Sequence, residues 1–527
     1  MGRNILFVTT DQQRYDALGC NGGTIARTPV VDQLARTGMI YRRAYNQNTV
    51  CMPARCTMLT GQYPRTHGVV ANGIALPADA PSVAAYLAEK AGYRTALIGK
   101  AHFEPGFDPN NRWEENARAA RGDTGPWRGF EHAINAVHVA AFRGRALSHY
   151  GEWLAENHPE HLESFGSLLG AEPGGDTAAP ETKHNPIPRG WYHTDWAADR
   201  CIDWLDTVQD GDDWFCWLSF PDPHHPWDPP QSEMHRVDWR ELDLPPGHPG
   251  DADRTRKLLA DRPAHWLRWY EGTFLNAEGG PMRFSPGSLT HDQVREINAR
   301  VHVMNELIDE AVGRVLAAVE ARGWTADTDV IFTTDHGELQ GDLGLLYKGP
   351  FHVDALMRLP LVWRPAPSAG VTPADLSDPV GGVDLAPTFC AIAEVEPAPW
   401  MQGRALPTAA GAGTNERVLC EWDSQFPGYG MHMRSIYRDS WLCTVYEEST
   451  DGRPNGLERT WGDGVLRACG VHYDGSEGEL YRVDEDPYQW HNRWDDAACR
   501  SIRSDLVADL YDSLPAERRE LLVDAPA

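Results

Sequence analysis

Four apolar runs along the chain have the length and composition of buried strands. Each is bounded on at least one side by Asp, Gly or Pro, residues that end regular structure. The runs occupy residues 4–10, 93–98, 214–220 and 329–334. Short apolar runs between turn signals are consistent with the buried strands of an α/β sheet.

Helical spacing of apolar residues predicts helices between and after these runs. The clearest covers about residues 290–322, where apolar side chains recur every three or four positions and Gly323 ends the repeat. Further helices are predicted near residues 28–38, 82–92, 196–208, 383–393 and 506–514. The sequence therefore predicts an α/β fold with a large mixed, mostly parallel sheet flanked by helices.

Two stretches rich in Pro, Gly and charge interrupt this pattern, near residues 104–190 and 231–287. The first has one helical patch, around 148–157, and we interpret it as an insertion over the active face that selects the substrate. Three later runs are typical of antiparallel strands: 417–422, 433–438 and 441–446. We therefore predict a catalytic domain over 1–405 and a smaller α+β subdomain with a tail over 406–527.

Composition narrows the range of partners and locations. The 527 residues carry a net charge of −28, which argues against nucleic acid and against an anionic membrane surface as partners. The apolar run 5–8 is too short for a signal peptide, and no stretch approaches transmembrane length. With ten mostly scattered cysteines, we expect reduced thiols and a cytoplasmic protein. The acidic surface permits homo-oligomers without specifying them.

Cys51 lies at a predicted helix start. Pro53 suits the first turn of a helix, and Arg55 lies one turn further on. Unpaired N–H groups and the helix dipole favour negative charge at such a position. A buried structural cysteine, or a pair with Cys56, is the alternative, although the spacing is not Cys-x-x-Cys. The pattern predicts an anion-binding pocket around a nucleophile.

Ionisable residues follow three of the predicted strands. Asp11 ends the first, Lys100 and His102 follow the second, and Asp335 and His336 follow the last. Each alone could be a turn residue, an exposed lysine or a packed histidine. The carboxyl ends of parallel strands share one edge of a sheet, so we expect these side chains to gather there.

The gathered groups suit one divalent metal. Hard cations prefer carboxylate oxygens, and a borderline metal also accepts imidazole. The predicted ligands are Asp11, the Gln12 amide oxygen, Cys51, Asp335 and His336.

Two further segments carry candidate residues. His224 and His225 lie in the proline-rich loop 221–230, where regular structure is excluded and the rings are held rigidly. Lys348 lies in the glycine-rich turn 344–349. A structural, hydrogen-bonded histidine remains the alternative for each ring.

Together these motifs resemble those of a known family. Cys51-x-Pro-x-Arg55 followed by Leu59-Thr60-Gly61 resembles the sulfatase signature, in which the cysteine is oxidised to formylglycine. The Lys-x-His pair, the Pro-His loop, Asp-His-Gly-Glu at 335–338 and the late lysine are also similar to that family. The chain is identified over nearly its whole length as a member of the type I sulfatases of the alkaline phosphatase superfamily.

The resemblance implies a mechanism. Formylglycine at position 51, made by a formylglycine-generating enzyme, would be hydrated and attack the sulfur of a small anionic sulfate ester, giving a covalent sulfo-enzyme intermediate. His102 would be the base that releases sulfate, and Arg55 would steady the hydrate. His224 would also assist the leaving group. The residues implied to bind substrate are Asn72, Lys100, His224 and Lys348.

Two positions depart from the usual pattern. Gln12 and His336 stand where many sulfatases have Asp and Asn, as in the branch of phosphonate monoester hydrolases and their arylsulfatase relatives. The metal therefore stays open between calcium and manganese, with magnesium as a further choice. Lys100 and His102 favour sulfate. The alternatives are a phosphonate monoester or phosphodiester hydrolase with promiscuous sulfatase activity, and a catalytically silent binding protein.

Overall fold

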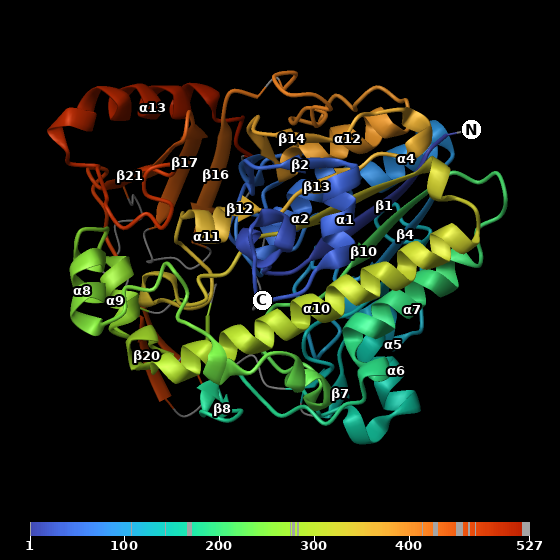
Figure 1. The fold of residues 1–527 in the computed structure, drawn as a ribbon, viewed down its shortest axis with the longest axis horizontal. Coiled ribbons are helices and arrows are strands. Elements are labelled where there is room, and N and C mark those ends of the chain that lie inside the picture. The colour runs from blue at the N-terminus through green and yellow to red at the C-terminus, as the bar shows by residue number, and fades with distance from the viewer. Residues whose placement is uncertain are drawn as a thin grey trace.

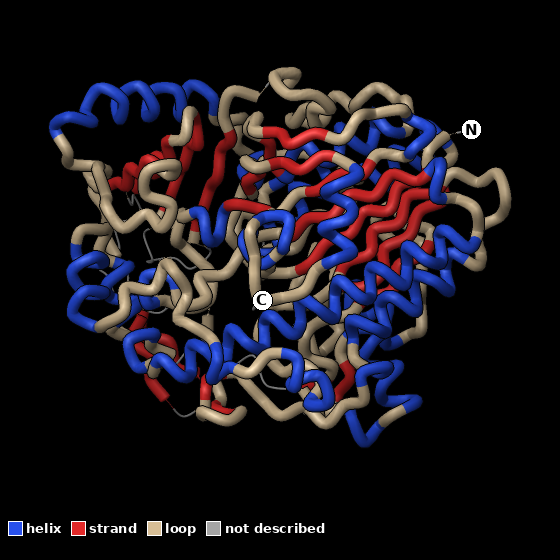
Figure 2. The backbone as a smooth tube through the Cα atoms, viewed as in Figure 1, coloured by secondary structure: helices blue, strands red, loops and turns tan. Residues whose placement is uncertain are grey.

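An eight-stranded mixed sheet forms the centre of the computed structural model (Figures 1 and 2). The structure describes residues 2–106, 108–142, 144–165, 171–274, 276, 280–281, 284–413, 415–424, 431–448, 457–461, 464–468 and 471–518. In spatial order the strands are β14 (Ala374–Leu376), β2 (Met39–Tyr41), β13 (Val362–Arg364), β11 (Thr328–Thr334), β1 (Asn4–Thr10), β10 (Trp214–Ser219), β4 (Arg94–Gly99) and β5 (His132–Asn135). All pairs are parallel except those that β13 makes with β11 and β2. The predicted mostly parallel sheet is confirmed.

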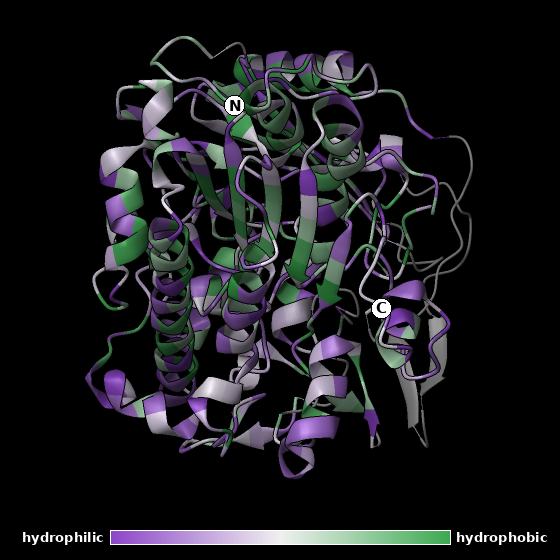
Figure 3. Cartoon of the chain, turned by 90° about the vertical axis from the view of Figure 1, so that its right-hand side faces the viewer, coloured by the Kyte–Doolittle hydropathy of each residue, from purple (hydrophilic) through white to green (hydrophobic). Residues whose placement is uncertain are grey.

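Helices cover both faces of this sheet because its strands are apolar on both sides (Figure 3). In β1, Leu6 and Val8 pack into one core with the helices α1 (Pro29–Thr37), α6 (Ser148–Asn157), α7 (His193–Leu205) and α10 (His291–Ala321). Ile5 and Phe7 face the opposite core with α2 (Cys51–Thr60), α4 (Val83–Ala91) and α12 (Leu385–Ile392). Alternation along the strand explains this division.

The long helix α10 begins where the sequence predicts. The Thr290 hydroxyl accepts a hydrogen bond from the backbone N–H of Gln293, and the Gln293 side chain accepts one from the backbone N–H of Thr290. This capping box satisfies two N–H groups that the first turn would otherwise leave unpaired.

The segment 104–190 is more regular than expected. It contains α5 (Glu114–Ala120) as well as α6, and its strand β5 pairs in parallel with β4. The expectation of a single helical patch was wrong, because short elements between Gly and Pro residues give no long hydrophobic period. That the segment is an insertion over the active face stays a prediction. The segment 231–287 likewise contains α8 (Ala252–Ala260) and α9 (His265–Tyr270).

A second, antiparallel sheet lies at the other end of the molecule (Figure 1). Its strands are β16 (Val418–Asp423), β17 (His432–Arg438), β18 (Trp441–Tyr446) and β21 (Gly478–Arg482). The last helix, α13 (Arg500–Ser513), packs Leu506 and Leu510 onto this sheet and begins six residues before the predicted start. The small subdomain is confirmed, and the boundary at 405/406 stays a prediction.

The remaining elements are short. They are β3 (Ala44–Tyr45), α3 (Pro64–His67), β6 (Ala141–Phe142), β7 (Arg145–Ala146), β8 (Pro173–Gly174), β9 (Ala179–Pro180), α11 (Asp354–Met357), β12 (Arg358–Leu359), β15 (Val380–Gly381), β19 (Leu457–Trp461) and β20 (Gly464–Ala468). Within the described ranges, no helix has the length and apolar character needed to span a membrane.

Gly99 is the last residue of β4 and lies directly before Lys100, in a conformation that a side chain would destabilise. Its φ is +101°, and a Cβ would lie 1.8 Å from the Ser219 carbonyl oxygen. Gly92 has a φ of +71° but no atom within 4 Å of its Cβ position. Gly92→Ala should lower the free energy of unfolding by about 1–2 kcal/mol. Gly99→Ala should cost about twice as much or more, since a backbone clash is added to the same conformational strain.

Urea unfolding followed by tryptophan fluorescence measures both losses. Equal decreases in the free energy of unfolding for the two variants would contradict the prediction. They would show that the Ser219 backbone shifts away from the added Cβ without destabilising the fold.

Candidate active site

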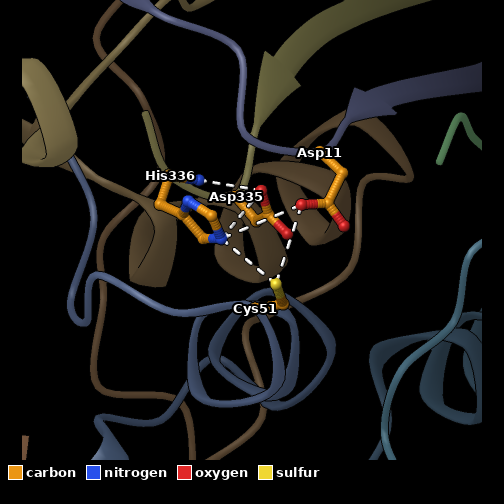
Figure 4. Close-up of side chains that lie close together, drawn as sticks. All are labelled: Asp11, Cys51, Asp335 and His336. Atoms are coloured by element: carbon orange, nitrogen blue, oxygen red, sulfur yellow. Dashed lines mark hydrogen bonds and ion pairs between the residues drawn. The ribbon is translucent and has the colours of Figure 1, made fainter. Parts of the chain in front are cut away.

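Cys51 lies at the first position of α2, among acidic and imidazole groups from the ends of β1 and β11 (Figure 4). Its Sγ lies 3.1 Å from Nε2 of His336 and 3.6 Å from Oδ1 of Asp11. His336 Nε2 is also 3.8 Å from Oδ1 of Asp335. The structure thus brings together four of the five predicted metal ligands.

Arg55 joins the two carboxylates of this cluster. The guanidinium is completely buried; its Nε donates to Asp335 Oδ2 at 2.7 Å, and its Nη2 lies 3.5 Å from Asp11 Oδ2. It also donates to the Lys100 carbonyl at 2.9 Å and to the Ser219 hydroxyl at 2.8 Å. One arginine therefore ties the ends of β1, β4, β10 and β11 together, a role that the sequence did not predict.

The cluster fits a divalent metal. Donor atoms of Asp11, Cys51, Asp335 and His336 all lie within 4.8 Å of one another and are buried. Two carboxylates and an imidazole are ligands that calcium, magnesium or manganese sites use to different extents. Gln12 directs its amide oxygen to the Lys348 ammonium, at 2.7 Å, so its role as a ligand stays a prediction.

Two lysines and two histidines form the wall beside this cluster. Lys100 is ion-paired with Asp11, and its Nζ donates to Nε2 of His138 at 2.8 Å. Lys348 donates to Nε2 of His224 at 2.5 Å. The rings of His138 and His224 stack with centroids 3.8 Å apart. His138, which the sequence analysis did not single out, thus links Lys100 to His224 and Lys348, whose role in binding substrate stays a prediction.

Burial and charge set the protonation of these groups. Burial, together with the neighbouring lysines, holds the pKa values of His138, His224 and His225 well below the ordinary histidine value, so these rings are neutral. Burial raises the pKa of Cys51, but Lys100 and Lys348 help to bring it below its ordinary value. A site with these charges favours an anion at position 51.

Glu338 holds the loop that carries Lys348. Its carboxylate accepts hydrogen bonds from the Tyr347 and Gln340 backbone N–H groups and from the Gln12 side-chain amide. Burial raises the pKa of Glu338 to about 7. The sequence contained this residue within its Asp-His-Gly-Glu motif but gave it no role.

His102 and Asn72 lie next to the cluster with contacts of other kinds. β4 ends at Gly99, and the His102 backbone, at a φ of +55°, donates its N–H to Glu115 at 2.8 Å. The Asn72 oxygen accepts a hydrogen bond from the Met52 N–H at 3.0 Å, which supports the start of α2. Their roles as base and as anion contact stay predictions.

The sequence missed His138 because it missed β5. This strand delivers residues 136–138 to the same carboxyl edge as Lys100, and the Ala136 N–H donates to the Gly99 carbonyl at 3.1 Å. The only signal was the short run 133–137, whose apolar residues are interrupted by Asn135.

Known proteins share both the sequence and the fold. The sulfatase family model matches residues 3–395. The uncharacterized sulfatase YidJ of Escherichia coli is 27% identical over 97% of this chain and 86% of its own length. The multifunctional alkaline phosphatase superfamily protein PehA of Trinickia caryophylli is 29% identical over 69% of this chain and 68% of its own.

Among solved structures, the phosphonate monoester hydrolase of Agrobacterium radiobacter has the same fold. It superposes with a TM-score of 0.73 at 23% identity, over 97% of this chain and 95% of that one. Since the family model covers most of the chain and the fold agrees, this protein belongs to the sulfatase family of the alkaline phosphatase superfamily and is a sulfuric ester hydrolase.

Proposed function

We propose that the chain hydrolyses small anionic sulfate esters with formylglycine, derived from Cys51, as nucleophile and one divalent metal as cofactor. The observation that carries this proposal is the position of Cys51, at a helix N-terminus between a carboxylate–imidazole cluster and two lysines. Asp11, Asp335 and His336 would hold the metal together with position 51, with the Gln12 amide as a further ligand. Calcium and manganese are the proposed ions, with magnesium as a further choice.

The metal and the formylglycine hydrate would supply an activated oxygen nucleophile and compensate charge that develops at sulfur. The chain's own residues orient the ester. Lys100 and Lys348 each offer an ammonium to sulfate oxygens. The Lys348 ammonium donates to Nε2 of neutral His224 at 2.5 Å, which would place an N–H group as proton source for the leaving oxygen beside the bound ester.

Maturation would precede folding of this segment. Cys51 is 1% exposed, so a formylglycine-generating enzyme would have to reach it before α2 packs. A cytoplasmic location and homo-oligomers stay predictions.

The second candidate is a phosphonate monoester or phosphodiester hydrolase with promiscuous sulfatase activity. It is favoured by Gln12 and His336 and by the fold shared with a phosphonate monoester hydrolase. Both esters are anions that two lysines could bind, so rates on matched substrates must separate them.

The first prediction concerns position 51. Tryptic peptides of protein from its native host should contain formylglycine there, and an aryl sulfate should be hydrolysed faster than the matched phenylphosphonate ester. Cys51→Ala should lower kcat/KM by at least about 10³-fold, because the nucleophile is lost. Cys56→Ala, further along the same buried helix, should keep most activity and serves as the control.

Faster phosphonate hydrolysis would move the assignment to the second candidate. An unmodified thiol with turnover of neither ester would contradict the proposed chemistry.

Metal removal gives the second prediction. A chelator should lower the thermal unfolding midpoint of the wild-type protein, since a ligand bound only to the native state stabilises by about 4 kcal/mol at a thousand times its Kd. Asp335→Asn should weaken metal binding more than about tenfold and lose most of this shift. Elemental analysis and thermal unfolding, each with and without chelator, measure both effects.

Asp329→Asn is the matched control, since Asp329 is buried at the other end of β11, where its carboxylate accepts a hydrogen bond from the Trp363 indole N–H. A chelator shift that is the same in wild type and Asp335→Asn would contradict the ligand assignment.

A further inference from the structure

The site contains two lysine–histidine pairs built in the same way. Since an ammonium can only donate, Nε2 accepts in both rings, His138 from Lys100 and His224 from Lys348. The two rings are nearly parallel, at 10°, with centroids 3.8 Å apart. His224 also donates its Nδ1–H to the His225 carbonyl, so its plane is fixed by the loop 221–230.

His138 determines where the Lys100 ammonium can point. Lys100 has three N–H donors and is 2% exposed, so water does not hold it. One donor faces Asp11 and one faces His138, and no other residue in the described part of the chain accepts the third. Two fixed directions on a tetrahedral ammonium fix the remaining N–H, which is left for a ligand.

A second metal in this wall is the competing interpretation. Donor atoms of Asp11, His138 and His224 lie within 4.8 Å of one another. Both Nε2 atoms, however, already accept from lysine ammonium groups. A divalent cation there would have to displace two positive charges, so the arrangement favours an anion.

We propose that His138 is a positioning residue for sulfate. It holds the third N–H of Lys100 toward the bound anion, and its stacking fixes the orientation of the His224 ring. This inference rests on the proposed role of Lys100 and Lys348 as sulfate ligands. His138 comes from the segment 104–190, so this segment contributes to the anion pocket.

Two variants separate the two contacts. His138→Gln keeps an acceptor for Lys100 but removes the ring, and His138→Phe keeps a ring on His224 but removes the acceptor. Titration calorimetry with inorganic sulfate should show a Kd about 10-fold higher or more for the Phe variant, because a hydrogen bond to a charged group is lost. The Gln variant should stay within about 3-fold of wild type. KM for p-nitrophenyl sulfate should follow the same order, with kcat changing less.

A double-mutant cycle with Lys100→Ala tests whether His138 acts through Lys100. In the Lys100→Ala background, His138→Phe should change the sulfate Kd by less than about 2-fold. His352→Phe is the control for replacing a buried, hydrogen-bonded histidine; His352 lies against Ser435 of the small sheet, and its variant should bind sulfate like wild type.

Equal losses of sulfate affinity in His138→Phe and His138→Gln would overturn the proposal. So would an effect of His138→Phe on the sulfate Kd that is as large in the Lys100→Ala background as in wild type. So would wild-type protein that hydrolyses sulfate esters without measurable sulfate binding, or divalent-metal binding abolished by His138→Phe alone. Sulfate binding with the expected order of variants, but no ester hydrolysis by wild type, would leave His138 its role and contradict the proposed function.

Discussion

The site depends on mutual compensation of buried charges. Asp11, Arg55 and Asp335 are all completely buried, and Lys100 is 2% exposed. An isolated ion in such surroundings would cost many kcal/mol, and removing one partner of a buried pair typically costs about 3–5 kcal/mol. Arg55 meets two carboxylates, and Asp11 meets two cations, so no member of the set is stable in its charged form without the others. Substitutions here are therefore expected to act as a group and not additively.

The parallel sheet allows these charged groups to be buried next to one another. Strands β1, β11, β10 and β4 pair in register, and their carboxyl ends deliver short polar side chains to one edge. Arg55 reaches this edge from α2. Other side chains of this helix pack into the apolar core that contains Phe7. The rigid backbone fixes where each charge lies, which is what preorganised electrostatic stabilisation requires.

The sequence predicted the parts of this arrangement that depend on strong local signals. The long apolar strands placed Asp11, Lys100 and Asp335 at one edge, and the Cys-x-Pro pattern placed Cys51 at a helix start. Contacts between segments far apart along the chain were not predictable. Nothing local shows that Arg55 binds two carboxylates, or that β5, four residues long, brings His138 to the lysine.

Charge alone does not decide between the two ester classes that remain for this fold. Burial holds the pKa values of His138 and His224 well below the ordinary histidine value, so the positive charge of the wall that they form with Lys100 and Lys348 comes from the two ammonium groups. Sulfate monoesters and phosphonate monoesters are both monoanions. They differ in that sulfate offers three terminal oxygens, whereas the phosphonate offers two and a carbon substituent.

Any discrimination between them that rests on Lys100 and Lys348 depends on the donors that remain after internal bonding. Lys100 directs two of its N–H groups to Asp11 and His138, and Lys348 donates two of its own to Gln12 and His224. Each ammonium then keeps one N–H without an acceptor among the described residues, in a direction that the protein has already fixed. A phosphonate that turned its carbon substituent toward either donor would leave that donor unpaired at a cost of about 1–3 kcal/mol, or roughly 5- to 150-fold in affinity, whereas one that turned both oxygens toward the donors would not. Under the proposed roles of Lys100 and Lys348, a sulfate ester would offer an oxygen to both donors in each of its three equivalent rotations about the ester bond, whereas a phosphonate would do so only with its carbon substituent turned away from both.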